Sequence, residues 1–234
     1  SKRRGAASVM DYQRAGFLPE ALRNFLALLG WAPGDDREIM TLEELVAAFS
    51  LDRVQAKAAV FDETKLEWMN GVYLQKRTAA ELLADVLPLW RQRGIPEADL
   101  VDRERLERIV ALFRERSRKI ADIADQAVYF FRDPEGYEEA AAKKHFKPET
   151  LPLLDALLER LATQEPFDTP ALEALFRALA AEKGVGAGKL IHPTRLAASG
   201  VSFGPGLFEM LEALGRETVL RRLRRARAHV ASRP

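Results

Sequence analysis

Apolar residues recur at helical spacing along most of this chain. Between Leu18 and Leu29 they fall mainly three or four positions apart, and Gly30 closes the segment. Residues spaced in this way share one side of an α-helix, so that side can be buried. Helical segments with this spacing, or with proline and glycine at their boundaries, are predicted over residues 100–113, 120–131, 148–161, 168–184, 187–199 and 205–214 and over the arginine-rich C-terminus. No run alternates with period two beside a hairpin turn, so the predicted fold class is all-α.

Polar residues at several of the predicted helix starts fit N-terminal caps. Capping boxes are predicted at Thr41–Glu44 and at Thr78–Glu81, where the hydroxyl accepts a free backbone N–H and the carboxylate reaches back. Asp62 can cap a further helix in the same way, and the pair Asn70-Gly71 predicts the end of that helix.

The length and the breaks in periodicity indicate more than one helical domain. The chain has 234 residues, enough for one large domain or two to three small ones. Apolar periodicity lapses near residues 75–78 and between residues 132 and 147, where proline or glycine appears or a cap interrupts the pattern. We take these two places as joints between domains.

The composition excludes several classes of protein. The chain has no cysteine, which rules out a disulfide scaffold, a thiolate zinc site and a cysteine nucleophile. Its three histidines are not near one another in the sequence, so no metal ligands are predicted. No stretch approaches the roughly 20 apolar residues of a membrane span, and nothing N-terminal resembles a signal peptide. We therefore expect a soluble, cytoplasmic protein with no membrane partner.

The net charge of +1 hides an asymmetry along the chain. Residues 1–75 and 76–166 each carry a net charge of −2, whereas residues 167–234 carry +5, with six arginines between Arg216 and Arg227. A second basic cluster lies between Arg114 and Lys119. Basic clusters on a nearly neutral chain favour local contacts to phosphate groups, and a solvated helix face is the alternative.

No motif in the chain carries a complete catalytic site. The glycine-rich run at residues 184–189 follows a predicted helix rather than a strand and lacks the P-loop pattern. It can be an anion-binding nest or a flexible connection between helices, and the second interpretation is favoured. None of the histidines has a serine or carboxylate at catalytic spacing, so no catalytic residue is predicted.

An ordered series of short motifs carries a resemblance to a known family. The first three residues resemble the end of the Lys-Met-Ser-Lys-Arg loop at the ATP site of class I aminoacyl-tRNA synthetases. The series continues at residues 8–12, at residues 16–31 (GFLPEALRNFLALLGW), at residues 61–73 and at residues 195–208 (RLAASGVSFGPGLF). The chain closely resembles bacterial glutamyl-tRNA synthetases, strongly to about Tyr73, moderately near the C-terminus and loosely between.

The resemblance implies that this chain is a tRNA-binding part of such an enzyme. Residues 1–76 would form the stem-contact fold, residues 77–140 a first anticodon-binding subdomain and residues 141–234 a second one. The nucleotide-binding domain of the family lies upstream of the matching region, and nothing here resembles it. By this resemblance the parent enzyme uses ATP and Mg²⁺ to join glutamate to tRNA, while this fragment holds no cofactor and is inactive alone.

The resemblance also suggests roles for particular residues. Arg116 occupies the position of an arginine that reads the third anticodon base, a cytosine; it is expected on a helix, with Arg114 and Arg118 on other faces. The remaining contacts to the anticodon are expected at Arg195, Gly204, Pro205 and Leu207, although Arg195 could instead pair with a carboxylate and Leu207 could be core. Ser1, Lys2 and Arg3 would be the remnant of the ATP-site loop, and contacts to phosphates are expected at Arg114, Arg118, Lys119, Arg221, Arg222, Arg224 and Arg225.

The expected partner is therefore a glutamate-specific tRNA, bound by a monomer, with no role for DNA. By the same resemblance, an arginine at position 116 favours a glutamate-only enzyme over one that also serves the tRNA for glutamine. The alternative is a non-catalytic α-helical module that binds another protein through its apolar surfaces. Proteins read RNA sequence by contacting unstacked loop bases with arginine planes and hydrogen bonds, while lysine and arginine hold the phosphates. The basic clusters of this chain agree with the tRNA-binding interpretation.

Overall fold

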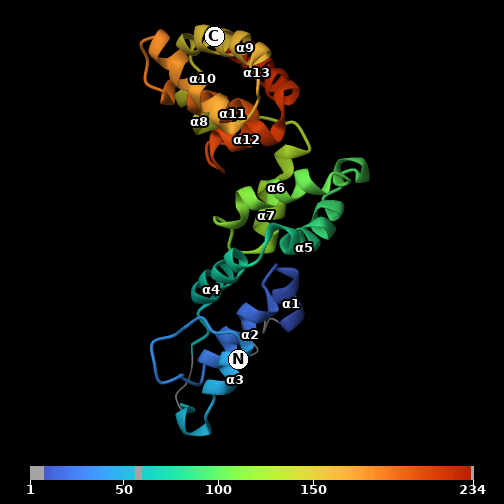
Figure 1. The fold of residues 1–234 in the computed structure, drawn as a ribbon, viewed down its shortest axis with the longest axis vertical. Coiled ribbons are helices and arrows are strands. Elements are labelled where there is room, and N and C mark those ends of the chain that lie inside the picture. The colour runs from blue at the N-terminus through green and yellow to red at the C-terminus, as the bar shows by residue number, and fades with distance from the viewer. Residues whose placement is uncertain (1–7, 56–59, 233–234) are drawn as a thin grey trace. The chain divides into compact units, whose positions relative to one another are not determined.

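The computed structural model describes residues 8–55 and 60–232. The expectation for Ser1, Lys2 and Arg3 lies outside these residues. Within them the regular structure is helical, and the one β-type contact is an isolated bridge between Trp31 and Val54 (Figure 1). The all-α prediction is confirmed.

The chain packs into two compact units. The first holds the described residues up to Leu100 together with Phe113–Asp125, and the second holds Val101–Leu112 together with the residues from Gln126 onward. The division passes through α6 (Arg103–Arg114) and separates the last residue, Gln126, from α7 (Ile120–Gln126). These units are defined by packing, and the expected domain boundaries near residues 76 and 140 stay predictions.

The first unit is built around the contact between helices α2 and α4. Phe17, Leu22 and Phe25 are buried against Leu66 and Met69, at the helical spacing that the sequence showed. The helices of this unit are α1 (Val9–Arg14), α2 (Pro19–Leu28), α3 (Leu42–Ala48), α4 (Glu63–Lys76), α5 (Ala79–Gln92) and α7 (Ile120–Gln126), with short 3₁₀ turns at Leu51–Arg53 and Glu97–Leu100.

The predicted caps are present in the structure. Both capping boxes, at Thr41–Glu44 and at Thr78–Glu81, make their two reciprocal hydrogen bonds. The Asp62 carboxylate accepts the backbone N–H of Lys65 at 3.1 Å at the start of α4. A further capping box between Ser8 and Asp11 begins α1, and the sequence analysis did not identify it.

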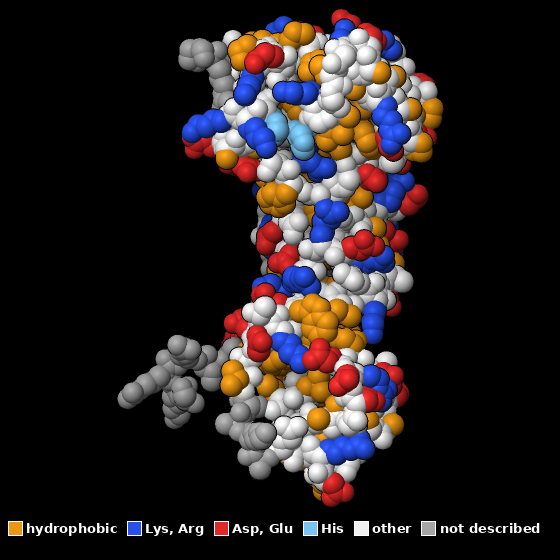
Figure 2. Space-filling view, turned by 90° about the vertical axis from the view of Figure 1, so that its left-hand side faces the viewer, with side chains coloured by type: hydrophobic (Ala, Val, Ile, Leu, Met, Phe, Trp, Pro, Cys, Tyr) orange, Lys and Arg blue, Asp and Glu red, His pale blue; other side chains and the backbone are white. Residues whose placement is uncertain are grey.

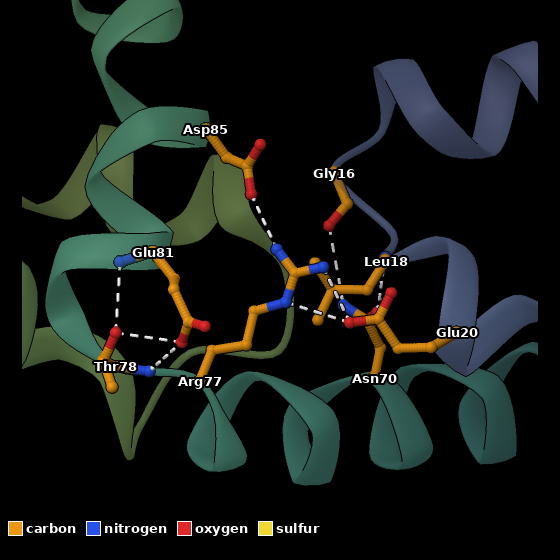
Figure 3. A network of polar contacts seen from close by, with 8 residues as sticks. All are labelled: Gly16, Leu18, Glu20, Asn70, Arg77, Thr78, Glu81 and Asp85. Carbon is orange, nitrogen blue, oxygen red and sulfur yellow. Dashed lines mark hydrogen bonds and ion pairs between the residues drawn. The ribbon is translucent and has the colours of Figure 1, made fainter. Parts of the chain in front are cut away.

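The predicted end of α4 at Asn70-Gly71 is wrong, because the helix continues to Lys76. Asn70 is fully buried; its side-chain oxygen accepts the Leu18 N–H at 2.8 Å, and its amide donates to the Arg118 carbonyl at 2.5 Å and the Gly16 carbonyl at 3.5 Å. Figure 3 shows how Asn70 reaches the segment before α2. The polar residue stays inside the helix because distant backbone groups satisfy it.

Arg77 stands at the break between α4 and α5, where its backbone is extended. Its guanidinium donates to Glu20 of α2 and to Asp85 of α5, each at 2.9 Å (Figure 3). The side chain is 28% exposed, so the two carboxylates hold a partly buried cation between three helices. This break is the local feature that the sequence analysis took as a joint.

The second unit packs around the C-terminal helix α13. This helix lies against α9 along much of its length and also contacts α11 and α12, while α10 packs on α9, α11 and α12 (Figure 1). Leu157, Leu161, Phe176 and Leu223 are among its fully buried side chains. The helices are α8 (Glu139–His145), α9 (Leu151–Thr163), α10 (Thr169–Glu182), α11 (Gly188–Ser199), α12 (Leu207–Leu214) and α13 (Arg216–Ala231), with 3₁₀ turns at Val128–Phe130 and Pro148–Thr150.

Candidate nucleic-acid interface

The first candidate contact, Arg116, lies in a turn and not on a helix. Helix α6 ends at Arg114, and the Arg116 N–H bonds to the Phe113 carbonyl at 3.1 Å in the turn that follows. Arg116 is exposed. The expectation that Arg114 and Arg118 occupy other faces of one continuous helix with Arg116 is therefore wrong.

The turn that carries Arg116 is fixed to one side of α4. Gln75 donates to the Glu115 carbonyl at 3.1 Å on one side of Arg116, and Asn70 donates to the Arg118 carbonyl on the other. Glu67 forms an ion pair with Lys119 at 2.8 Å. Positions 67, 71 and 75 recur every four residues on a helix and so share a face, with Asn70 beside them. An exposed guanidinium thus projects from a backbone that is held on both sides.

The other basic residues near this turn differ in their availability. Arg114 is partly buried and donates to the Arg77 carbonyl at 3.3 Å. Arg118 is exposed, and its side chain crosses α4 at Gly71, where an added Cβ would lie 3.0 Å from the Arg118 Cδ. The Glu67 carboxylate raises the pKa of Lys119, so this ammonium stays charged but is already paired. Of these three residues, Arg118 is the exposed cation next to Arg116.

In the second unit, Arg195 lies beside Gly204, as expected for neighbouring parts of one site. A Cβ built on Gly204 would lie 3.3 Å from the Arg195 Nη1 and 3.6 Å from the Tyr129 hydroxyl. The glycine also has a φ of +145°, a conformation that side chains rarely adopt. A residue without a side chain therefore leaves room for the guanidinium against the backbone.

Pro205 and Leu207 follow directly but are buried, with Leu207 only 4% exposed at the first position of α12. The Leu207 side chain is core, which was one of the two interpretations of this residue. Because both side chains are buried, any contact that Pro205 or Leu207 makes to a ligand would use backbone groups. The start of α12 has no side-chain cap.

Helix α13 separates its arginines between surface and interior. Arg224 and Arg225 are exposed, and Arg225 also donates to the Glu135 carbonyl at 3.2 Å. Arg221 is half exposed and forms an ion pair with Asp133. Arg227, also on α13, forms a two-pronged ion pair with Asp155 at 2.9 and 3.2 Å.

Arg222 is buried, with 2% of its surface exposed. Its Nε donates to Asp133 at 2.8 Å, Nη1 donates to the Ala198 carbonyl at 2.5 Å, and Nη2 donates to the carbonyls of Tyr129 and Arg132 at 2.7 and 2.9 Å. Burial lowers the pKa of Arg222 to about 10, which leaves the guanidinium charged at neutral pH. This placement does not fit the phosphate contact expected for Arg222, because its donors are used inside the protein.

The structure also joins two residues that the sequence analysis kept apart. The rings of His145 on α8 and His192 on α11 stack with centroids 4.9 Å apart and an interplanar angle of 22°. The statement that no histidine lies near another holds along the sequence but is wrong in space. No sequence signal could have revealed the pair, since 46 residues separate its members. Among the described residues, no group of three or more His, Cys, Asp or Glu side chains is arranged to hold a metal ion.

Comparison with known proteins assigns the chain to a family. A family model described as the anticodon binding domain matches residues 77–227, nearly two thirds of the chain. The chain belongs to the anticodon-binding-domain family. A second model, for the catalytic domain of the class I tRNA synthetases for glutamate and glutamine, matches residues 1–68.

Curated relatives of this anticodon-binding-domain protein are glutamate–tRNA ligases. The one from Moorella thermoacetica is 46% identical over 229 residues, which cover 97% of this chain and 47% of that protein, and the one from Geobacter sulfurreducens is 43% identical over 231 residues, covering 98% and 48%. A solved glutamate tRNA ligase from Elizabethkingia meningosepticum superposes with a TM-score of 0.87 at 32% identity, covering 94% of this chain and 43% of that one. The chain thus spans about half the length of the curated relatives it matches.

Proposed function

We propose that this chain binds the tRNA for glutamate and positions it for glutamylation by the remainder of a glutamate–tRNA ligase. The observation that carries the proposal is the exposed Arg116 on a turn held to α4 at Glu115 and Arg118, within the span of the anticodon-binding model. Recognition of a base needs a donor group whose backbone is already fixed, since ordering it on binding would cost free energy. In this proposal Arg116 reads the third anticodon base.

The second unit contributes contacts to the other anticodon bases in this proposal. Arg195 beside Gly204 supplies a half-buried guanidinium, while Pro205 and Leu207 shape the turn and offer backbone groups. Arg118, Arg221, Arg224 and Arg225 supply phosphate contacts, Lys119 and Arg114 reinforce the first cluster, and Arg222 holds α13 in place instead.

We further propose that ATP and Mg²⁺ are handled by the rest of the parent enzyme and that the work is done in the cytoplasm, where tRNA is charged. No helix among the described residues is long and apolar enough to cross a membrane. All the exposed large apolar side chains described, apart from Val101 and Phe203, lie between Val9 and Trp68, within the span matched by the catalytic-domain model. This concentration supports a chain that works as part of a longer enzyme.

Binding of tRNA across a series of salt concentrations tests the proposal. We expect the tRNA for glutamate to bind more tightly than an unrelated tRNA, the tRNA for glutamine or a DNA hairpin, with an affinity that falls steeply as salt rises. A protein-interaction module would show neither the preference nor the salt dependence. Sedimentation of the complex should give one chain per tRNA.

A further inference from the structure

The histidine pair lies within a group of cations on the surface of the second unit. His145 and His192 stack at 4.9 Å, and Figure 2 shows adjacent histidine side chains with Lys and Arg side chains beside them. His192 is exposed and His145 is half-buried. The pair joins the end of α8 to the first turns of α11, two helices that pack together.

The charged groups that act on His145 are all positive. Partial burial lowers the pKa of His145, and His192, Lys144, Lys189 and Lys147 lower it further, with no carboxylate acting against them. Lys144 and His145 are on α8, Lys189 and His192 are on α11, and Lys147 precedes the following 3₁₀ turn. The His145 imidazole, stacked on His192 among three ammonium groups, resists protonation unless an anion compensates the positive charge.

The pair also lies on the same side of α11 as Arg195. Positions 188, 192 and 195 are separated by four and three residues and therefore form one stripe along the helix. Gly188 begins the stripe, and a Cβ there would lie 3.4 Å from the His192 ring. Arg195, one turn further along, approaches Gly204. A strand of RNA that passes Arg195 would therefore meet the imidazoles next.

We propose that His145 and His192, with Lys144, Lys147 and Lys189, form a pH-dependent binding site for a backbone phosphate of RNA next to the base held at Arg195 and Gly204. The inference rests on the proposed tRNA-binding function. The imidazolium forms donate to the phosphate oxygens, and the lysines add charge. Binding of the anion raises the pKa of His145, so the affinity is greatest at low pH and falls as pH rises through the pKa of His145 in the complex.

The test uses the anticodon stem-loop of the tRNA for glutamate and the whole chain, between pH 5.5 and pH 8.0. Because a pKa that rises by one corresponds to a tenfold change in equilibrium, a rise of about that size predicts an affinity about tenfold higher at the lower pH. His145→Gln with His192→Gln should remove most of this gain and reduce the salt dependence at pH 5.5 but not at pH 8.0. His229→Gln is the control for a histidine outside the pair, since His229 lies on α13 against Tyr137 and Phe146.

NMR titration of the histidine ring protons supplies a second measurement on the unaltered chain. The ring signal of His145 should titrate at higher pH in the RNA complex than in the free chain. Inorganic phosphate alone should not reproduce the shift; if it does, the site binds small anions and its assignment to RNA is overturned. If the double variant and the unaltered chain show the same pH dependence of affinity, the inference is overturned. If the unaltered chain shows no preference for the tRNA for glutamate over other tRNAs, the proposed function itself is contradicted.

Discussion

At the scale of single residues, burial separates arginines that hold the fold from arginines that a ligand can reach. Arg222 makes four hydrogen bonds in the interior, whereas Arg116 and Arg224 are exposed on a turn and a helix face. A guanidinium has five N–H donors and no acceptor, so the same side chain satisfies carbonyls inside the protein or base and phosphate acceptors outside it. The surroundings of each arginine therefore predict the effect of replacing it.

Arg116→Gln should relax discrimination between cytosine and guanine at the third anticodon position. Glutamine retains hydrogen bonding but lacks the charge and the fork that fits the O2 and N3 acceptors of cytosine. Discrimination should fall by about 1–3 kcal/mol, by analogy with two-pronged contacts to DNA bases. The measurement is the ratio of affinities for tRNAs that differ at that base, and overall affinity should fall less than this ratio.

Arg103→Gln is the control for that change, because Arg103 is an exposed arginine on α6 whose side chain pairs with Glu107 at 2.7 Å. It should leave the ratio of affinities unchanged. If Arg118→Gln abolishes the preference while Arg116→Gln retains it, then Arg116 is not the residue that reads the base.

Asn70→Ala should destabilise the first unit, because it leaves the Leu18 N–H and the Arg118 carbonyl without their partner in the interior. Each buried group left unsatisfied costs about 1–3 kcal/mol, and the chemical denaturation midpoint should fall accordingly. Gln75→Ala is the comparison on the same face of α4, since Gln75 is exposed and should change stability by less than about 0.5 kcal/mol. Equal effects of the two changes would contradict the role given to the buried amide.

At the scale of elements, α13 is a helix with two functions on different sides. Val219, Leu223 and Ala226 are buried in the second unit, and Arg222 joins them through its hydrogen bonds. Arg224 and Arg225 face solvent on the same helix. The charge of the arginine-rich segment is thus divided between the packing of the helix and its surface.

Replacing Arg224 and Arg225 by Gln should weaken binding to matched and unmatched tRNA alike, because phosphate contacts release counterions whatever the base sequence. The slope of log affinity against log salt should become less steep by about one for each arginine that no longer binds a phosphate. Thermal unfolding should not change. An unaltered slope would show that this face is only solvated.

Arg222→Gln should have the opposite profile, with little direct effect on the salt slope and a loss of stability. Removing one partner of a buried ion pair costs about 3–5 kcal/mol, and the exposure of Asp133 and its second pair with Arg221 place the expected loss at the lower end. Denaturant unfolding followed by circular dichroism measures it. Retained stability would mean that the carbonyls around Arg222 find other donors.

At the scale of the whole molecule, the chain has two packed units, and its first 68 residues match the catalytic-domain model. The span that matches the catalytic-domain model ends at residue 68, within α4, and the same helix holds the turn of Arg116. The end of the matched span, in α4, and the candidate anticodon contact Arg116 thus belong to the same packed unit. This arrangement gives a fixed spacing between them within that unit.

The 234-residue chain alone should catalyse neither ATP–pyrophosphate exchange nor aminoacylation, because only its residues 1–68 match the catalytic-domain model and it spans about half the length of its relatives. A purified chain that still binds the tRNA for glutamate should give exchange at the level of a protein-free blank. Exchange above that level would contradict the proposal that activation of glutamate belongs to the remainder of the enzyme.

The sequence by itself determined most of the helical elements, several of their starts and the family, but it predicted neither α1 nor α8, which lies within the joint expected at residues 132–147. Helical periodicity and caps such as Thr41–Glu44 and Thr78–Glu81 depend on residues within four positions of one another, so they can be read locally. The ordered motifs that resemble glutamyl-tRNA synthetases also need only the order of residues. These features led to the all-α fold and to the anticodon-binding family.

Only the tertiary structure decided which of the candidate residues are available and what the exceptions to local rules mean. Asn70-Gly71 has the composition of a helix end, yet distant backbone groups satisfy Asn70 and the helix continues. Arg222 lies in a run of similar arginines and is buried, and His145 meets His192 across 46 residues of sequence. Burial and pairing of this kind are set by groups far apart along the chain, and local spacing carries no information about them.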